Sequence, residues 1–269
     1  MANNTKHPSL SMGRITAAIF SGFLMGIAAG LIGVGGGEFR IPILLYVLGL
    51  SVITAIAVNL LVGLLTVLVS FLRRFQLGLL NEHAISIALS MSIASIIGAY
   101  LGALLTHKIP EKPLKKILAI FLIIVGLKIG LEPFIHTPMI FQFTWDAFSE
   151  TMLALLVGLV IGIISGALGV AGGEFRIPIL IYLFGFDIIV AGTASLLVSI
   201  PTVAMGFTKH HRMGHMNRNA TIIAVAMGAA SVAGALIGAS SAGIIDKDVL
   251  KVLLGAILIL ATVRMTTKP

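Results

Sequence analysis

The sequence predicts an all-α, polytopic membrane protein built from two homologous repeats. Hydrophobic residues make up 58% of the chain and charged residues only 10%, whereas a soluble domain carries about 25% charged residues. Apolar runs of about 20 residues, long enough to cross a bilayer as helices, recur along the chain. A glycine-rich stretch at residues 33–42 returns almost unchanged at residues 169–178.

The first repeat, residues 1–131, is expected to contain one broken helix and three spanning helices. The glycines that begin at Gly33 interrupt the broken helix, residues 15–48. Pro42 has no backbone N–H and therefore suits the first turn of the helix that follows the break. The three spans are expected at residues 52–72, 83–105 and 114–131.

A polar linker, residues 132–150, leads to the second repeat, residues 151–269, which has the same order of elements. An offset of 136 residues, as from Gly33 to Gly169, aligns most of each half without gaps. Because Glu, Arg, Pro and Tyr coincide in this alignment, it indicates an internal duplication rather than shared hydrophobicity. The broken helix of this repeat is expected at residues 151–184 and its spans at residues 188–207, 219–242 and 249–264.

The distribution of basic residues predicts how the repeats are oriented. If the broken segments dip into the membrane and return, the repeats are inverted; if they cross it, the repeats are parallel. Lys and Arg accumulate on the cytoplasmic side, and the inverted arrangement segregates them better. It leaves four on one face, Arg73, Arg74, Lys247 and Lys251. It places eleven on the other: Lys6, Arg14, Lys108, Lys112, Lys115, Lys116, Lys209, Arg212, Arg218, Arg264 and Lys268. We therefore expect inverted repeats with both termini in the cytoplasm.

The glycine-rich stretches are the candidate substrate site. Non-helical backbone at membrane depth persists only where it is buried in protein or lines a wet cavity, and a helix that starts there directs its positive end into that space. Arg40 and Arg176 add positive charge and a planar fork of donors that suits oxyanions. We expect the two halves to share one central anion site. The glycines that let the backbone turn and a ligand approach are Gly35, Gly36, Gly37, Gly172 and Gly173.

Four further polar residues belong to this prediction. Glu38 and Glu174 lie two residues before the arginines; as proton carriers they would couple transport to protons, and as counter-ions they would only pair with the arginines. Coupling to sodium is a further alternative. Asn59 and Ser195, at equivalent positions of the next span, either line the site or make interhelical hydrogen bonds. Glycines spaced four residues apart, as at Gly26, predict close helix packing, either within a protomer or between the protomers of a homodimer.

Several function classes are excluded or disfavoured. The chain has no cysteine, which excludes thiol chemistry, and it has no phosphate-binding loop, zinc motif or Ser/His/Asp set within its spans. We therefore expect neither an enzyme nor a cofactor nor a metal. The net charge of +8 is attributed to cytoplasmic loops and not to nucleic-acid binding. The cluster of His210, His211 and His215 with Lys209 and Arg212 is interpreted as a solvated basic loop in preference to a metal site.

At these residues the sequence resembles the sulfite exporter TauE/SafE family. The match consists of the duplicated glycine-rich loop, Pro42 or Pro178 after it, and the basic stretch that ends at Gly214. It extends over residues 15–263. The resemblance implies a permease of the bacterial or archaeal inner membrane that moves small sulfur-containing anions, such as sulfite or organosulfonates, usually outward. Many family members carry apolar residues after the glycines, and the Glu and Arg found here suit a larger or doubly charged anion.

The predicted function is therefore a secondary transporter whose partners are a small anionic substrate and the lipid bilayer. An anion channel, or a permease for carboxylate or inorganic anions, would use the same site. A metal-cation permease with Glu38 and Glu174 as ligands would need further carboxylates or histidines in the spans, which this sequence does not have.

Overall fold

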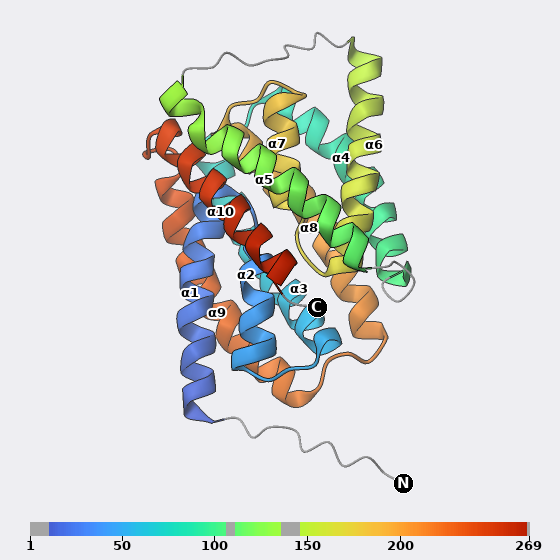
Figure 1. Ribbon diagram of the computed structural model, residues 1–269, viewed down its shortest axis with the longest axis vertical. Coiled ribbons are helices and arrows are strands. Elements are labelled where there is room, and N and C mark those ends of the chain that lie inside the picture. Colours follow the sequence, from blue (N-terminus) through green and yellow to red (C-terminus); the bar gives the residue numbers. More distant parts are fainter. Residues whose placement is uncertain (1–10, 106–110, 136–145, 268–269) are drawn as a thin grey trace.

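The computed structural model describes residues 11–105, 111–135 and 146–267, and every regular element in these ranges is a helix. Figure 1 shows the helices as a bundle with several long, closely packed members. The first repeat contains α1 (Met12–Ile32), α2 (Gly37–Pro42), the π-helical turn η1 (Ile43–Val47), α3 (Val52–Gln76), α4 (Glu82–Leu105) and α5 (Glu111–Ile135). The second contains α6 (Ala147–Leu168), α7 (Gly173–Tyr182), α8 (Ile188–Arg212), α9 (Arg218–Ser241) and α10 (Lys247–Thr267).

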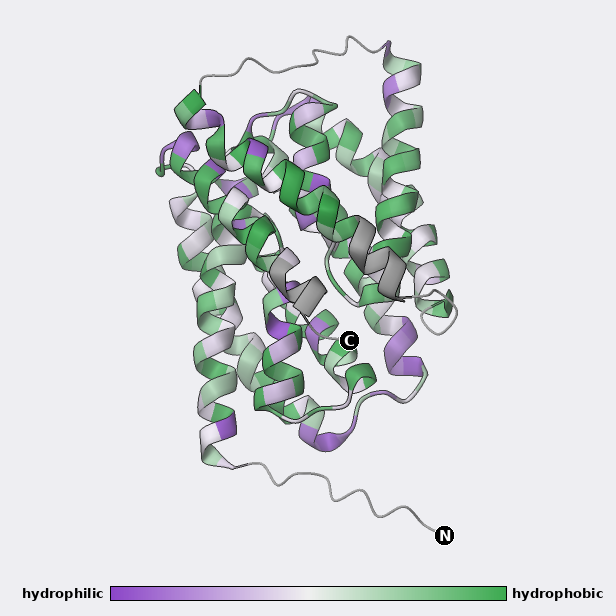
Figure 2. Cartoon of the chain, viewed as in Figure 1, coloured by the Kyte–Doolittle hydropathy of each residue, from purple (hydrophilic) through white to green (hydrophobic). Residues whose placement is uncertain are grey.

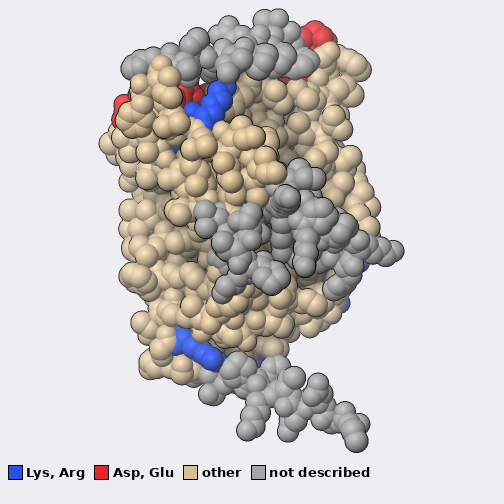
Figure 3. All heavy atoms as spheres, in the orientation of Figure 1, with Lys and Arg blue, Asp and Glu red and all other residues tan. Residues whose placement is uncertain are grey.

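The described part of the chain has the character of a membrane protein. Seven of its helices are long and apolar enough to span a bilayer: α1, α3, α4, α5 from Leu118, α6, α8 and α9. Large apolar side chains such as Phe20, Ile93 and Val225 are more than 60% exposed, which would be costly in water and is favourable against lipid. Figure 2 shows hydrophilic residues near the upper and lower ends of the molecule and at a few places inside the bundle. On the face shown in Figure 3, the charged residues lie toward the two ends.

The break in each repeat lies where the sequence predicts it, but the new helix begins earlier than expected. α2 begins at Gly37, so Pro42 falls in its second turn and not in the first turn predicted for it. Proline cannot donate the backbone hydrogen bond that an α-helix needs there. The chain continues from Pro42 as the wider π-turn η1, in which the N–H of Leu48 donates to the carbonyl of Ile43. In the second repeat α7 continues through Pro178 to Tyr182 without such a turn.

Equivalent helices of the two repeats run in opposite directions in Figure 1. α1 begins at the lower end of the view and α6 begins at the upper end. After its break, the chain of the first repeat returns to the lower end before α3 begins, and the chain of the second repeat turns into α8 near the upper end. Each broken segment therefore enters and leaves the bundle on the same side.

The two repeats interlock through matched helix pairs. α1 packs on α9, and its equivalent α6 packs on α4; α3 packs on α8, and α5 on α10. Small residues make these contacts close: a Cβ on Gly26 of α1 would lie 2.2 Å from the carbonyl oxygen of Ser231 in α9, and one on Gly162 of α6 would lie 2.5 Å from that of Ser95 in α4. These glycine ladders are thus used between the repeats of one protomer, which was one of the two roles predicted for them.

Candidate anion site between the repeats

The glycine-rich loops of the two repeats contact each other face to face. A Cβ on Gly35 would lie 2.6 Å from the Cβ of Ala171, the residue at the equivalent position of the other loop. A Cβ on Gly173 would lie 2.7 Å from the carbonyl oxygen of Val34. Side chains at these positions would push the loops apart, so glycine is required for the approach.

Glycine is also required by the backbone conformation at the start of each short helix. Gly36 (φ 69°) precedes α2 and Gly172 (φ 75°) precedes α7, both in the left-handed region, which other residues adopt at a steric cost. A Cβ on Gly37 would lie 2.8 Å from the side-chain nitrogen of Asn59. In this structure the predicted site glycines therefore allow the loops to adopt their conformation and to pack closely.

Arg40 of α2 is fully buried and bonds only to neutral groups. Its Nε donates to Oδ1 of Asn59 at 3.0 Å, and its Nη2 donates to the carbonyl oxygen of Gly35 at 2.5 Å. Its Nη1 donates to the hydroxyls of Thr66 in α3, at 3.3 Å, and Ser231 in α9, at 3.4 Å. One guanidinium thus links its own loop to helices of both repeats.

Arg176 of α7 is equally buried and holds the second loop in a similar way. Its Nη2 donates to the carbonyl oxygen of Ala171 at 3.5 Å, at the position equivalent to Gly35. Its Nη1 donates to the carbonyl oxygen of Ser195 at 3.0 Å and to Oγ of Ser199 at 2.8 Å, both in α8. Its Nε has no hydrogen-bond partner in the part of the chain that the structure describes. Each arginine therefore donates a hydrogen bond to the carbonyl oxygen at the middle of its own loop.

The arginines do not form ion pairs with the neighbouring glutamates. Within the described ranges, no carboxylate oxygen lies within 4 Å of either guanidinium, although each arginine interacts electrostatically with the glutamate two residues before it. The direct Glu–Arg pairing that the sequence left open is therefore absent from this structure. The hydrogen bonds that the structure gives the two guanidiniums go to carbonyl, amide and hydroxyl groups.

Glu38 and Glu174 face each other across the contact between the repeats. Glu174 is 1% exposed and lies close enough to Glu38 for the two carboxyl groups to interact electrostatically. All four of their carboxyl oxygens are buried, and among the described residues they have no hydrogen-bond partner other than each other. This is an unusual state, because buried polar atoms in folded proteins are nearly always bonded.

Asn59 and Ser195 lie beside the loops but differ in what they contact. Asn59 accepts from Arg40 and donates from Nδ2 to the carbonyl oxygen of Gly169 at 2.8 Å, so it joins the loop of one repeat to that of the other. Ser195 contacts Arg176 through its backbone, and its buried hydroxyl has no partner. Both predicted residues thus belong to the site region, with Asn59 as a bridge between the repeats.

Sequence reasoning missed one contact between two hydroxyl groups on each side of the site. Oγ1 of Thr66 lies 2.7 Å from Oγ of Ser231, and the equivalent atoms of Thr202 and Ser95 also lie 2.7 Å apart. Each pair joins α3 or α8 of one repeat to α9 or α4 of the other. The 136-residue offset relates the two pairs, so the duplication shows that the pairs are equivalent. It does not show that the two hydroxyls of a pair are in contact.

Arg74 was expected just after a span, on one face of the membrane, and the structure shows that it is buried. α3 continues past the predicted end at residue 72, and Arg74 is fully buried within it. Its guanidinium donates to the carbonyl oxygens of Gly30 and Leu31 at the end of α1, and to Ile189 and Thr193 of α8. Helix ends leave such carbonyls without partners, so Arg74 caps α1 from within the protein.

His210, at the position equivalent to Arg74, was expected in a solvated loop and is also buried. It lies inside α8, which extends to Arg212 and not to residue 207, and it is 2% exposed. Its Nδ1 lies 3.0 Å from Nδ1 of His215, whereas His211 is exposed. No group of three or more potential metal ligands occurs among the described residues. Part of the basic face predicted from charge, including Lys6, Lys108 and Lys268, lies outside the described residues.

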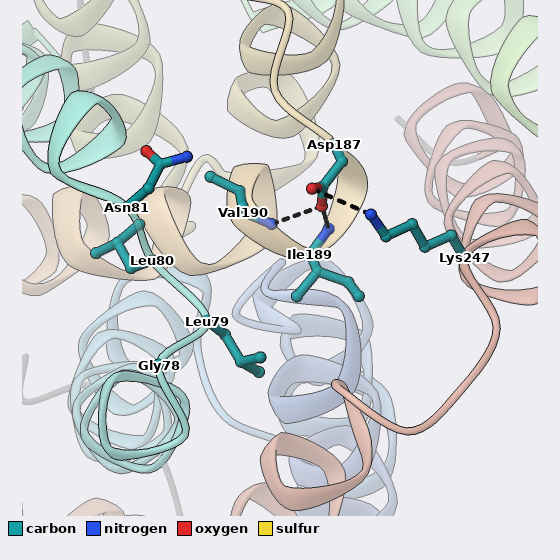
Figure 4. A pocket seen from close by; sticks show the side chains of 8 residues that line it. All are labelled: Gly78, Leu79, Leu80, Asn81, Asp187, Ile189, Val190 and Lys247. Atoms are coloured by element: carbon teal, nitrogen blue, oxygen red, sulfur yellow. Dashed lines mark hydrogen bonds and ion pairs between the residues drawn. The ribbon is translucent and has the colours of Figure 1, made fainter.

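A shallow groove of about 260 Å³ lies away from the glycine-rich loops, at the end of the molecule where α3 leads into α4. In Figure 4, Asp187 projects between the backbone at the start of α8 and Lys247. Its carboxylate caps α8 by accepting from Ile189 and Val190, and it pairs with Lys247 at 3.2 Å. Because the carboxylate is already satisfied by these groups, the groove has the features of a helix cap and not of an anion site.

Comparison with known families agrees with the duplicated architecture. The family model described as "Sulfite exporter TauE/SafE" matches residues 2–129 and again residues 150–269, which is nearly the whole chain. The chain belongs to the sulfite exporter TauE/SafE family. No curated protein and no solved structure matches it.

Membership of the TauE/SafE family confirms the resemblance seen in the sequence. This TauE/SafE protein is a multi-pass membrane transporter and not an enzyme. The two matched segments correspond to the two repeats, so each contributes one glycine-rich loop, one buried arginine and one glutamate with buried carboxyl oxygens to the contact described above.

Proposed function

We propose that this TauE/SafE protein is a secondary transporter that exports small sulfur-containing anions, such as sulfite or an organosulfonate, across the cytoplasmic membrane. The observation that carries the proposal is the pair of buried guanidiniums, Arg40 and Arg176, without an ion-pair partner, at the place where the two loops meet. Buried charges are normally paired. A bound anion would supply the missing negative charge.

The donor geometry favours an oxyanion. A guanidinium presents parallel N–H groups that match two oxygens of a sulfonate, sulfite or carboxylate. In the described arrangement these donors are occupied by loop carbonyls and by hydroxyls of α3, α8 and α9. We propose that the loops separate when the anion enters and that its oxygens replace those weaker neutral acceptors.

A binding screen tests the class of anion. The purified protein is heated with sulfite, thiosulfate, taurine, sulfoacetate and plain carboxylates, and a ligand of the folded state raises the unfolding temperature. We expect the sulfur oxyanions to give the largest increases. A protein stabilised only by carboxylates would instead be a carboxylate permease, and one stabilised by none of these anions would contradict the proposal.

Counterflow distinguishes a carrier from the alternative, an anion channel. Proteoliposomes loaded with unlabelled anion are diluted into labelled anion, and a carrier accumulates label transiently because it exchanges one molecule for another. We expect this overshoot with the anion selected by the screen. Equilibration without an overshoot would support the channel.

We further propose that the repeats are inverted in the membrane, with both termini in the cytoplasm. The opposite directions of α1 and α6 support this arrangement (Figure 1), as does the bias of basic residues. Because the chain has no cysteine, single cysteines can be introduced directly and labelled in intact cells with an impermeant maleimide.

For this topology test, Leu77→Cys and Phe148→Cys are informative because both side chains are exposed. Inverted repeats place both positions outside the cell, whereas parallel repeats place both in the cytoplasm. Met213→Cys, cytoplasmic in either case, is the control. We expect labelling of the first two variants only; protection of all three until the cells are opened would establish parallel repeats.

A further inference from the structure

The glutamates at the contact between the repeats have a feature that anion binding alone does not explain. Glu38 and Glu174 are equivalent in the two repeats, their carboxyl groups interact with each other, and their four buried oxygens have no other hydrogen-bond partner among the described residues. If they were only counter-ions, they would be expected to bond the arginines. The guanidiniums are instead directed to Gly35, Ala171 and the hydroxyls of the flanking helices.

Two ionised carboxylates are unfavourable in this position. An isolated buried carboxylate pays a large desolvation cost, and two neighbouring carboxylates repel each other. Of the charged groups that face the pair, each glutamate interacts with one arginine, Arg40 or Arg176. The other titratable side chains described on elements packed against α2 and α7 are not among the groups that interact with Glu174: Arg14, Tyr46, Arg73, Arg74, Lys128, Glu132, Lys209, His210, His211 and Arg212.

The composition of the site favours a proton over a metal ion as the occupant. Cation sites of hard metals use six or more oxygen ligands. No cluster of three or more acidic, histidine or cysteine side chains occurs in the described ranges. Two facing carboxyls can instead share or bind protons without further ligands.

We propose that Glu38 and Glu174 form a proton-binding site whose protonation is required for the anion to bind between the repeats. This inference rests on the proposed function. With both carboxyls neutral, the two arginines leave a net charge of about +2 at the loops, which attracts an anion; with both ionised, that charge is cancelled and the attraction is lost. The linkage is reciprocal, so anion binding takes up protons. The anion and the proton therefore cross together, and export down an outward anion gradient carries protons outward.

The proton site is tested without any substrate by infrared spectroscopy of the purified protein. A protonated buried carboxyl has a C=O stretch that is distinct from that of a carboxylate. We expect this band in the parent protein at neutral pH and its loss in the double variant Glu38→Gln/Glu174→Gln. The control is Glu82→Gln, at an exposed position at the start of α4. Identical spectra of the parent and the double variant would overturn the proposal.

The linkage is tested by calorimetry with sulfoacetate, at pH 6 and pH 8, in buffers of different ionisation enthalpy. The parent protein should bind up to about tenfold more weakly per pH unit for each proton taken up. The double variant, which is permanently neutral, should bind with the same affinity at both pH values and without proton uptake. Binding by the parent that is independent of pH, or that requires sodium, would overturn the inference and leave the anion site intact. Absence of anion binding at every pH would contradict the proposed function, while the infrared result would still decide whether the carboxyls hold protons.

Discussion

Replacement of Arg176 by Gln, or of Arg40 by Gln, is expected to weaken anion binding about 100-fold. Removing one member of a buried, hydrogen-bonded charge interaction costs about 2–5 kcal/mol, and 100-fold corresponds to about 2.7 kcal/mol. Gln retains a donor and an acceptor for the neighbouring loop, but it loses the charge that would balance the anion. Isothermal titration with the best anion of the screen measures the change.

Two matched variants make this result interpretable. Arg176→Lys keeps the charge without the planar fork, so it should retain part of the affinity. Arg218→Gln removes an arginine that is exposed at the start of α9, and it should leave binding unchanged. If both Arg40→Gln and Arg176→Gln fold and bind the anion as tightly as the parent, neither arginine contacts the substrate.

Replacement of Arg74 by Met is expected to cause the largest loss of stability, about 3 kcal/mol. The variant leaves the buried carbonyl oxygen of Gly30 and the partly buried one of Leu31 without the donors they have at 3.0 and 2.6 Å. Each unsatisfied buried group costs about 1–3 kcal/mol. Part of this cost is offset because burying Met, unlike burying Arg, does not remove a charge from water. Thermal unfolding of the detergent-solubilised protein, monitored by circular dichroism, measures the loss.

The neighbouring residue supplies the control for Arg74. Arg73 is only partly buried, and its Nε donates to the hydroxyl of Ser240 at 2.8 Å. Arg73→Met should therefore lower the unfolding temperature much less than Arg74→Met. Equal effects of the two substitutions would show that the burial of Arg74 adds nothing to the stability of the fold.

Much of the architecture could be predicted because it depends on local patterns. Apolar runs specify the long helices, and the offset between Gly33 and Gly169 specifies the duplication. The glycines that break the helices could also be recognised, since a left-handed backbone conformation is a property of single residues such as Gly36 and Gly172. Helix ends were less predictable: α3 and α8 continue several residues beyond the predicted limits, because burial of Arg74 and His210 stabilises helical turns that look polar in sequence.

The sequence by itself determined that this protein has a duplicated, membrane-spanning helical fold with charged residues at two glycine breaks, because periodicity and hydrophobicity are encoded in neighbouring residues. Only the tertiary structure decided which groups satisfy those charges. Arg40 contacts Ser231, from the other repeat, in place of Glu38, and the two glutamates face each other across the repeats. A long side chain buried between helices takes its partners from whichever segments pack around it, and those segments are far apart in the chain.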